Sequence, residues 1–368
     1  MFDAVSSVIS SVFGRGSSLS VPILDGALKP NNMIERATIF AERPNLEDLV
    51  LGPENALYAA CGKDVLKLSE AGEFTIVARF DRPVSALAFM SGAELAVGLG
   101  NAVIVGAGTS ARTIDSADGK AFVAVNALSA TSDGGLLITD GSTTRPYAQW
   151  SHDLMEAGRT GRLLRYDNAA GRATTLASGL GYAFGAMVDG RGRTLVSESW
   201  RHRLSLVEGG RAREAVPALP GYPSRLAPTE DGGFWLTLFS CRTQLVEFVL
   251  QEDDYRREMM RTIDPRYWVA PALSSGDDYM EPLQGGSVKQ MGILKPWAPP
   301  RSYGLAVRFD ADFMPLYSVH SRTGGRNHGI VAAVQRGDDL FLLSKGAGRV
   351  LQLSASEIQS AWAKGTNE

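Results

Sequence analysis

The sequence predicts an all-β protein, a six-bladed β-propeller with an N-terminal helix and a helical or loop insertion near the mouth of its channel. Short apolar segments recur along the 368-residue chain, each with a polar or Gly-rich turn. The six segments are GPENALYAAC (52–61), SGAELAVGLG (91–100), SDGGLLITDG (132–141), DGRGRTLVSE (189–198), EDGGFWLTLF (230–239) and RGDDLFLLSK (336–345). Asp-Gly and Gly-Gly turns between β-rich runs are typical of hairpins. Because a hairpin followed by further strands is the unit of a propeller blade, six units predict six blades.

The repeats define three regions of the chain: an N-terminal helix and extended arm (1–38), the propeller (39–355) and a C-terminal tail (356–368). The helix is predicted from the apolar spacing in MFDAVSSVISSVFGRG, which suits an amphipathic helix packed on the protein body. Membrane or partner contact is the alternative for this helix.

Two insertions interrupt the repeats, at about 142–160 and 246–303. The second contains a helical stretch, EDDYRREMMRTI, that ends at Asp264-Pro265. A loop this long in a compact fold is usually a lid or a binding element, and a purely structural cap over one end of the channel is the alternative.

Composition limits the kinds of partner. The net charge of -3 gives no reason to expect binding to nucleic acid or to an anionic membrane. The chain has two Cys, Cys61 and Cys241, which are too few for a disulfide framework, although a single disulfide between them is not excluded by the sequence. The chain has four His, which argues against a His-rich zinc site. No apolar run reaches about 18 residues, so no membrane span is expected. The N-terminus carries Asp3 and no basic region, which predicts no signal peptide and a cytoplasmic protein.

Blade geometry predicts which residues lie at the channel mouth. If an inner strand begins at the mouth and its hairpin partner returns to the same height, a residue and the one about fourteen positions later both lie there. The resulting pairs are Glu47 and Cys61, Asn126 and Asp140, Phe184 and Glu198, and Ser224 and Leu238. His328 precedes the sixth inner strand, near several Gly, and is expected at a flexible rim. Propellers bind ligands at the channel mouth, so this set is the predicted site for a small-molecule substrate.

Three segments carry a family resemblance: TDGSTTRPYAQWSHDLMEAGRT (139–160), GRLLRYDNAAGRATTLASGL (161–180) and LPGYPSRLAPTEDGGFWLTL (219–238). They resemble the strictosidine synthase-like family, which is related to the paraoxonases and the gluconolactonase-type enzymes. The resemblance covers roughly residues 40–350 and is most specific over 139–238. It implies a six-bladed propeller, in agreement with the hairpin count.

The resemblance also bears on a metal. In calcium-dependent members, a Glu from the first blade and Asn or Asp from later blades hold the ion, which polarises a lactone or ester carbonyl. Glu47 and Asn126 match two of these ligands, whereas Phe184 and Arg225 replace two others. Calcium needs about six oxygen ligands, and a guanidinium repels a nearby cation. The sequence therefore predicts no cofactor, with Arg225 supplying the positive charge and pairing with Glu47 or a ligand anion. Calcium held by Glu47 and Asn126 is the alternative.

The alkaloid-forming members of the family condense an amine with an aldehyde through a Glu on the sixth blade. Ala332 aligns with that Glu in IVAAVQRGDDLFLLS, which argues against the same condensation.

The candidate site residues fall into two groups. The catalytic candidates are Glu47, Asp140, Arg225 and His328, and the substrate-binding candidates are Asn126, Phe184, Glu198, Tyr147, Trp150 and His152. Arg225 is the candidate electrophile or carboxylate binder, and Glu47, Asp140 or His328 is the candidate base. Structural alternatives stay open: hydrogen bonds between blades for Asn126, turn bonds for Asp140 and Glu198, and packing for His152.

The favoured function is hydrolysis of a lactone or ester in a small, partly apolar molecule, without the usual calcium. One alternative is metal-independent acid–base chemistry, as in a lyase or isomerase. The other is a ligand-binding propeller without catalysis, because a fold does not fix a function. The substrate and the oligomeric state are not defined by the sequence.

Overall fold

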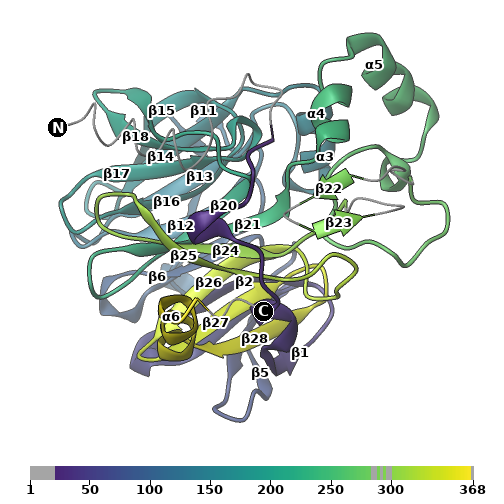
Figure 1. Cartoon of the computed structure of the whole chain (residues 1–368). Coiled ribbons are helices and arrows are strands. Elements are labelled where there is room, and N and C mark those ends of the chain that lie inside the picture. The colour runs from purple at the N-terminus through teal and green to yellow at the C-terminus, as the bar shows by residue number, and fades with distance from the viewer. Residues whose placement is uncertain (1–20, 283–287, 291–292, 296–300, 366–368) are drawn as a thin grey trace.

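The computed structural model describes residues 21–282, 288–290, 293–295 and 301–365, and its fold is a ring of six four-stranded antiparallel sheets (Figure 1). The predicted six-bladed propeller is therefore confirmed. Written from the innermost strand outward, the first three blades are β2 (Leu46–Leu51), β3 (Leu57–Cys61), β4 (Asp64–Leu68), β5 (Phe74–Arg79); β6 (Ala86–Phe89), β7 (Leu95–Gly98), β8 (Val103–Val105), β9 (Arg112–Ile114); and β12 (Val125–Ala130), β13 (Leu136–Asp140), β14 (Gly161–Asp167), β15 (Arg172–Leu180).

The fourth and fifth blades follow in chain order, and the sixth combines both ends of the chain. They are β16 (Ala183–Val188), β17 (Thr194–Glu198), β18 (Arg203–Glu208), β19 (Arg211–Val216); β20 (Gly221–Pro228), β21 (Phe234–Cys241), β24 (Leu305–Phe309), β25 (Pro315–His320); and β26 (Ile330–Arg336), β27 (Asp339–Ser344), β28 (Arg349–Ser354), β1 (Thr38–Glu42). Strand β1 pairs antiparallel with β28, so an N-terminal strand closes the ring. Two short hairpins, β10–β11 (Ser116–Ala117, Lys120–Ala121) and β22–β23 (Val288–Gln290, Ile293–Lys295), lie outside the blades.

The inner strands surround a central channel. Each of β2, β6, β12, β16, β20 and β26 contacts the inner strands of the two neighbouring blades, and the contact between β26 and β2 completes the circle. Apolar residues fill the spaces between blades; Leu236, Val307 and Leu342, for example, are fully buried. The alternation of a short strand with a tight turn thus produces a fold whose blades have no independent core.

A β-bulge lies near the start of several inner strands. Leu46 pairs with Cys61 and Asp48 with Ala60, which leaves Glu47 as the extra residue. The register shifts in the same way around Asn126 and around Phe184. A bulge turns a side chain away from the regular ladder. The bulges therefore turn the side chains of Glu47, Asn126 and Phe184 away from the regular strand alternation, and all three lie at the same end of the channel.

Helices cover that same end of the channel. The first insertion forms η5 (Tyr147–Gln149) and α3 (Trp150–Met155), and the second forms α4 (Gln244–Val249), α5 (Asp253–Thr262) and η7 (Pro265–Tyr267). Arg256 of α5 donates to the Met155 carbonyl at 2.9 Å, and Met155, Val249 and Trp268 share one buried cluster with Phe184 and Phe239 of the blades. Figure 1 shows α3, α4 and α5 together on one side of the ring. The insertions thus form a cap over the Glu47 end.

The ends of the chain contain a few short helices. The amphipathic helix expected over residues 1–16 lies outside the described residues, and the first helical turns are η1 (Gly26–Leu28) and α2 (Met33–Arg36). Helix α6 (Ala355–Ala363) spans most of the region expected as a tail and buries Ile358 against the sixth blade.

The remaining helical turns lie between strands of the blades; they are η2 (Pro53–Asn55), η3 (Ser91–Ala93), η4 (Gly108–Ser110) and η6 (Ser199–Arg201). Among the described residues, no helix is both long and apolar enough to cross a membrane.

Candidate functional site

A three-residue polar cluster occupies the capped end of the channel. Glu47 comes from the bulge of β2, Lys345 follows β27, and Tyr147 begins η5 in the first insertion. The Lys345 Nζ lies 2.5 Å from Glu47 Oε1 and 3.1 Å from the Tyr147 hydroxyl, which itself donates to Glu47 Oε1. Burial, together with the negative charge of Glu47, raises the pKa of Tyr147 well above its usual value. Tyr147 therefore stays a hydrogen-bond donor at neutral pH.

Aromatic side chains form most of the wall beside this cluster. The small pocket is lined by Tyr147, Trp150, Tyr182, Phe184, Trp200, Phe239, Leu273, Val331 and Lys345. The rings of Tyr182 and Trp200 stack with centroids 4.5 Å apart, and Trp200 Nε1 donates to Asp153 Oδ1 at 2.7 Å. The free volume is about 10 Å³, which is room for about one water. The aromatic rings and the cap residue Leu273 thus close the pocket in this conformation.

Arg225 lies across the channel, below the aromatic pocket. Its Nη2 donates to the carbonyls of Asn126 at 2.6 Å and Ser85 at 2.9 Å, and its Nη1 to those of Glu47 and Val331, both at 3.4 Å. These four carbonyls belong to four different blades. The guanidinium also lies 5.3 Å from the centre of the Phe184 ring. Arg225 thus connects the inner walls of the ring at their centre.

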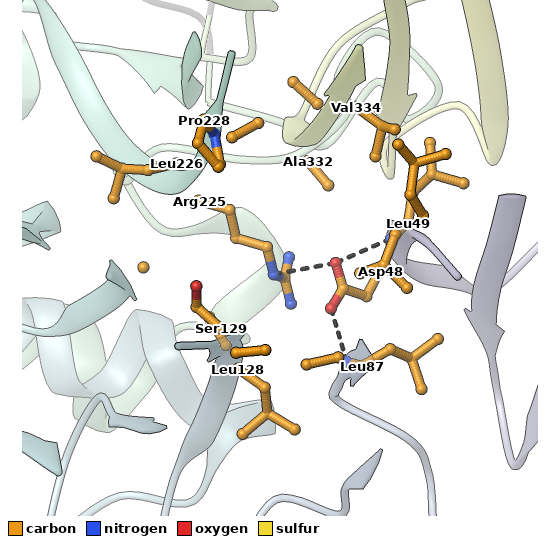
Figure 2. A pocket seen from close by; sticks show the side chains of 18 of the residues that line it. Asp48, Leu49, Leu87, Leu128, Ser129, Arg225, Leu226, Pro228, Ala332 and Val334 are labelled. Carbon is orange, nitrogen blue, oxygen red and sulfur yellow. Dashed lines mark hydrogen bonds and ion pairs between the residues drawn. The ribbon is translucent and has the colours of Figure 1, made fainter. Parts of the chain in front are cut away.

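The carboxylate partner of Arg225 is Asp48, not Glu47. Arg225 Nε lies 3.1 Å from Asp48 Oδ1, and both side chains are buried (Figure 2). Asp48 also accepts from the amides of Leu49 and Leu87, both at 2.8 Å. Burial raises the pKa of Asp48, although the Arg225 charge opposes that change. The expected pairing of Arg225 with the Glu47 carboxylate is wrong, because that carboxylate is bound by Lys345 and Tyr147 and Arg225 reaches only the Glu47 backbone carbonyl.

The donor set at this end does not fit a calcium ion. The Glu47 carboxylate already binds Lys345 and Tyr147, and the Asn126 side chain is committed to the Ala183 carbonyl at 2.9 Å and to the Thr139 hydroxyl at 2.6 Å. Within the described part of the chain, no three His, Cys, Asp or Glu side chains gather as metal ligands do. A divalent ion here would have to displace an ammonium and compete with a guanidinium.

Asp140 and Glu198 are buried acids whose oxygens have partners within their own blades. Asp140 accepts from the Ala124 amide and from Arg162 Nη2, both at 2.6 Å, and burial raises its pKa. Burial acts to raise the pKa of Glu198 as well. The Gly181 amide, the Ser205 hydroxyl and two Arg outweigh that effect, so the pKa of Glu198 is lowered. Neither acid lines the aromatic pocket.

The two candidate His lie apart from the polar cluster. His328 is buried rather than on a flexible rim, with Nδ1 2.7 Å from the Ser302 hydroxyl and Nε2 3.0 Å from the Arg322 carbonyl. His152 packs edge-on against Trp268 with ring centres 4.7 Å apart, and burial lowers its pKa. Asn126, which is fully buried, likewise joins its own blade to Ala183 of the next one.

The structure therefore brings together Glu47, Tyr147, Trp150 and Phe184, and adds residues that sequence reasoning missed: Lys345, Tyr182, Trp200 and Phe239. The signal for Lys345 was present. It lies fourteen positions after Val331, the spacing that identified the other mouth residues. The aromatic residues gave no such signal, because Trp and Phe at these positions look like ordinary core residues.

Sequence comparison identifies related proteins. Residues 126–205 match the strictosidine synthase family model. The strictosidine synthase-like protein 6 of Arabidopsis thaliana is 31% identical over 134 residues, which cover 36% of this chain and 36% of that protein. The adipocyte plasma membrane-associated protein of Salmo salar is 24% identical over 255 residues, or 60% of each chain. The matched stretch is thus about a third of the length of the plant relative.

Structural comparison identifies other propellers. A gluconolactonase from Xanthomonas campestris superposes with a TM-score of 0.55 at 13% identity, covering 86% of this chain and 88% of that one. A calcium-binding regucalcin from Agrobacterium tumefaciens gives a TM-score of 0.51 at 11% identity, covering 86% and 95%. At these identities the likeness shows the fold alone. Together with the ring of six four-stranded sheets, it confirms that this chain is a six-bladed propeller whose third and fourth blades are similar to the strictosidine synthase family.

Proposed function

We propose that this chain is a metal-independent hydrolase that acts on a lactone or ester of a small, partly apolar molecule at the capped end of the channel. The observation that carries the proposal is the cluster of Glu47, Lys345 and Tyr147 beside an aromatic pocket. It places one carboxylate and two hydrogen-bond donors at a single apolar wall. Gluconolactonases among the structural relatives support a hydrolytic reaction through their names alone.

The cluster contains the groups that ester hydrolysis requires. Glu47 is the general base that takes a proton from a water as its oxygen attacks the carbonyl carbon. The Lys345 ammonium and the Tyr147 hydroxyl donate to the carbonyl oxygen as it gains negative charge, the role of an oxyanion hole. When the tetrahedral intermediate collapses, the C–O bond to the leaving group breaks and Glu47 returns its proton to the departing alkoxide oxygen. The side chains of Lys345 and Glu47 are mostly buried, so each of these charge interactions is stronger than in water.

The charges in place support metal independence. Lys345 and Arg225 supply two cations at the level where relatives are expected to hold calcium. Because the closed pocket has little free volume, the substrate enters when the cap moves. The side chains of Trp150 and Leu273, which line the pocket, must then shift to make room for it.

The test is turnover of a panel of lactones and aryl esters, with and without calcium and chelator. We expect turnover that chelator leaves unchanged, and its loss by at least a hundredfold in Glu47→Gln and Lys345→Met, since removal of one oxyanion donor costs about 10²–10³ in kcat. Lys120→Met, at an exposed position, is the matched control. Stoichiometric calcium in elemental analysis, with activity lost in chelator, would refute metal independence.

A ligand-binding propeller without catalysis is the second candidate. It is favoured by the internal pairing of the cluster, since Lys345 and Tyr147 already satisfy the Glu47 carboxylate that a base must free. Saturable binding of a small molecule with no turnover of any lactone or ester would identify this case. Turnover of non-ester substrates with proton exchange would instead indicate the acid–base lyase or isomerase alternative.

A further inference from the structure

We propose that the opposite end of the channel is a second binding site, for a small neutral apolar molecule that carries one hydroxyl or carbonyl group. A chamber of about 270 Å³ lies there, on the far side of Arg225 from Glu47, and all six inner strands contribute to it (Figure 2). It shares no lining residue with the aromatic pocket. We call it the lower chamber.

The walls of the lower chamber are apolar. Leu49, Leu87, Leu128, Leu226 and Val334 surround it, as Figure 2 shows. Its size results from small residues on the inner strands, where Ala occurs repeatedly; these are Ala88, Ala127, Ala186, Ala227, Ala332 and Ala333. An apolar wall facing water gains free energy when an apolar ligand replaces that water.

The chamber reaches solvent at the ends of the inner strands. Ala130 and Pro228 are the last residues of β12 and β20, both line the chamber, and both are exposed. A ligand therefore has a path into the lower chamber that does not pass the cap or Arg225.

The floor of the chamber discriminates against anions. The Asp48–Arg225 ion pair forms this floor, with Nε 3.1 Å from Asp48 Oδ1, and both Nη1 and Nη2 already donate to two carbonyls each. An incoming carboxylate would find Nη1 and Nη2 of Arg225 already committed to carbonyls and would face the Asp48 carboxylate that is paired with Nε. A charged group buried without a partner is strongly disfavoured, so the ligand is neutral.

Ser129 supplies the polar contact of the site. Its side chain is half-buried and lines the chamber wall opposite Ala332. A hydroxyl can both donate and accept, so it suits either an alcohol or a carbonyl group. This contact gives the ligand one polar group rather than a purely hydrocarbon surface.

Isothermal titration calorimetry of the full chain with 1-octanol and with octanoate tests the proposal. These two probes share an alkyl chain and differ in charge. We expect saturable binding of one 1-octanol per chain and at least tenfold weaker binding of octanoate. Equal affinity for the two probes, or no saturable binding of 1-octanol, would overturn the proposal.

Paired variants locate the binding. Ser129→Leu fills the chamber at a half-buried position and should abolish 1-octanol binding, whereas Ser129→Ala removes only the hydroxyl and should weaken it by tenfold or less. Ala332→Leu fills the chamber from the opposite wall and should match Ser129→Leu; circular dichroism reports whether each variant folds. Trp150→Ala, in the aromatic pocket, should leave the affinity unchanged. Loss of binding in Trp150→Ala but not in Ser129→Leu would place the ligand in the aromatic pocket and refute the second site.

Discussion

Replacement of Arg225 by Met should destabilise the whole propeller. The side chain of Arg225 is 9% exposed and that of Asp48 is 2% exposed, so the change leaves a buried carboxylate without its cation. Removal of one partner of a buried pair costs about 3–5 kcal/mol. The Asn126 and Ser85 carbonyls lose close donors as well, at about 1 kcal/mol each. Because these terms overlap, we expect a loss of about 5 kcal/mol in the free energy of unfolding, comparable to the whole stability of many domains.

Urea unfolding measured at several pH values tests this estimate. Burial raises the folded-state pKa of Asp48, and Arg225 is the main influence that lowers it, so Arg225→Met raises that pKa further. A raised carboxyl pKa gives stability that is present at low pH and is lost as the pH rises through the folded pKa. The deficit of the variant should therefore be smaller at pH 5 than at pH 8.

Two controls isolate the buried pair. Arg213→Met removes an ion pair with Glu208 of 2.9 Å in which both side chains are more than half exposed, and should cost less than about 1 kcal/mol. The double variant Arg225→Met with Asp48→Leu should recover part of the loss, since no charge then stays buried alone. A deficit below about 1 kcal/mol in Arg225→Met, or one that is equal at both pH values, would refute this account of Arg225.

Three further predictions concern other buried groups. Glu198→Gln should lower the free energy of unfolding by about 2–3 kcal/mol at pH 7, measured in urea, because hydrogen bonds to a charged group are lost. Since the pKa of Glu198 is lowered on folding, this loss of stability should shrink as the pH falls below about 4. A loss that does not change with pH would contradict this prediction. Burial raises the pKa of both the Cys61 and the Cys241 thiols, so neither should react with a disulfide reagent at pH 8 before unfolding, and rapid labelling of the native chain would contradict this. Ile358→Ala should cost about 2–4 kcal/mol in urea unfolding if α6 is part of the fold, whereas an effect below about 0.5 kcal/mol would show a detachable segment.

The fold was readable from the sequence because a propeller repeats one local pattern. Each blade is recognisable in the sequence from a tight turn between apolar strands, such as the turn at Asp231–Gly233. Six such patterns predict a ring of six blades. The closure of the ring was harder to predict from the sequence. Strand β1 and its partner β28 lie near opposite ends of the sequence, so no local turn links them.

The sequence predicted where the candidate site lies along the channel, but not which of its side chains form ion pairs with one another. The fourteen-residue spacing located Glu47 and Phe184 and, applied from Val331, locates Lys345 as well. It did not predict that Asp48 rather than Glu47 meets Arg225, because nothing in the sequence marks the one-residue bulge at Glu47. Asp140 and Glu198 were indistinguishable from site acids in sequence, because their partners Arg162 and Arg203 sit on the third strand of each blade.

The pairing of β1 with β28 has a consequence for the order in which the protein assembles. During synthesis, β1 leaves the ribosome before the other blade strands and has no partner until β28 is made, so its edge is open to pairing with other chains in that interval. Closing a loop of about 300 residues costs roughly 5 kcal/mol of chain entropy, which only the completed ring repays. We expect a late, slow step in refolding that corresponds to this closure, and nascent chains that rely on chaperones until the final strand arrives.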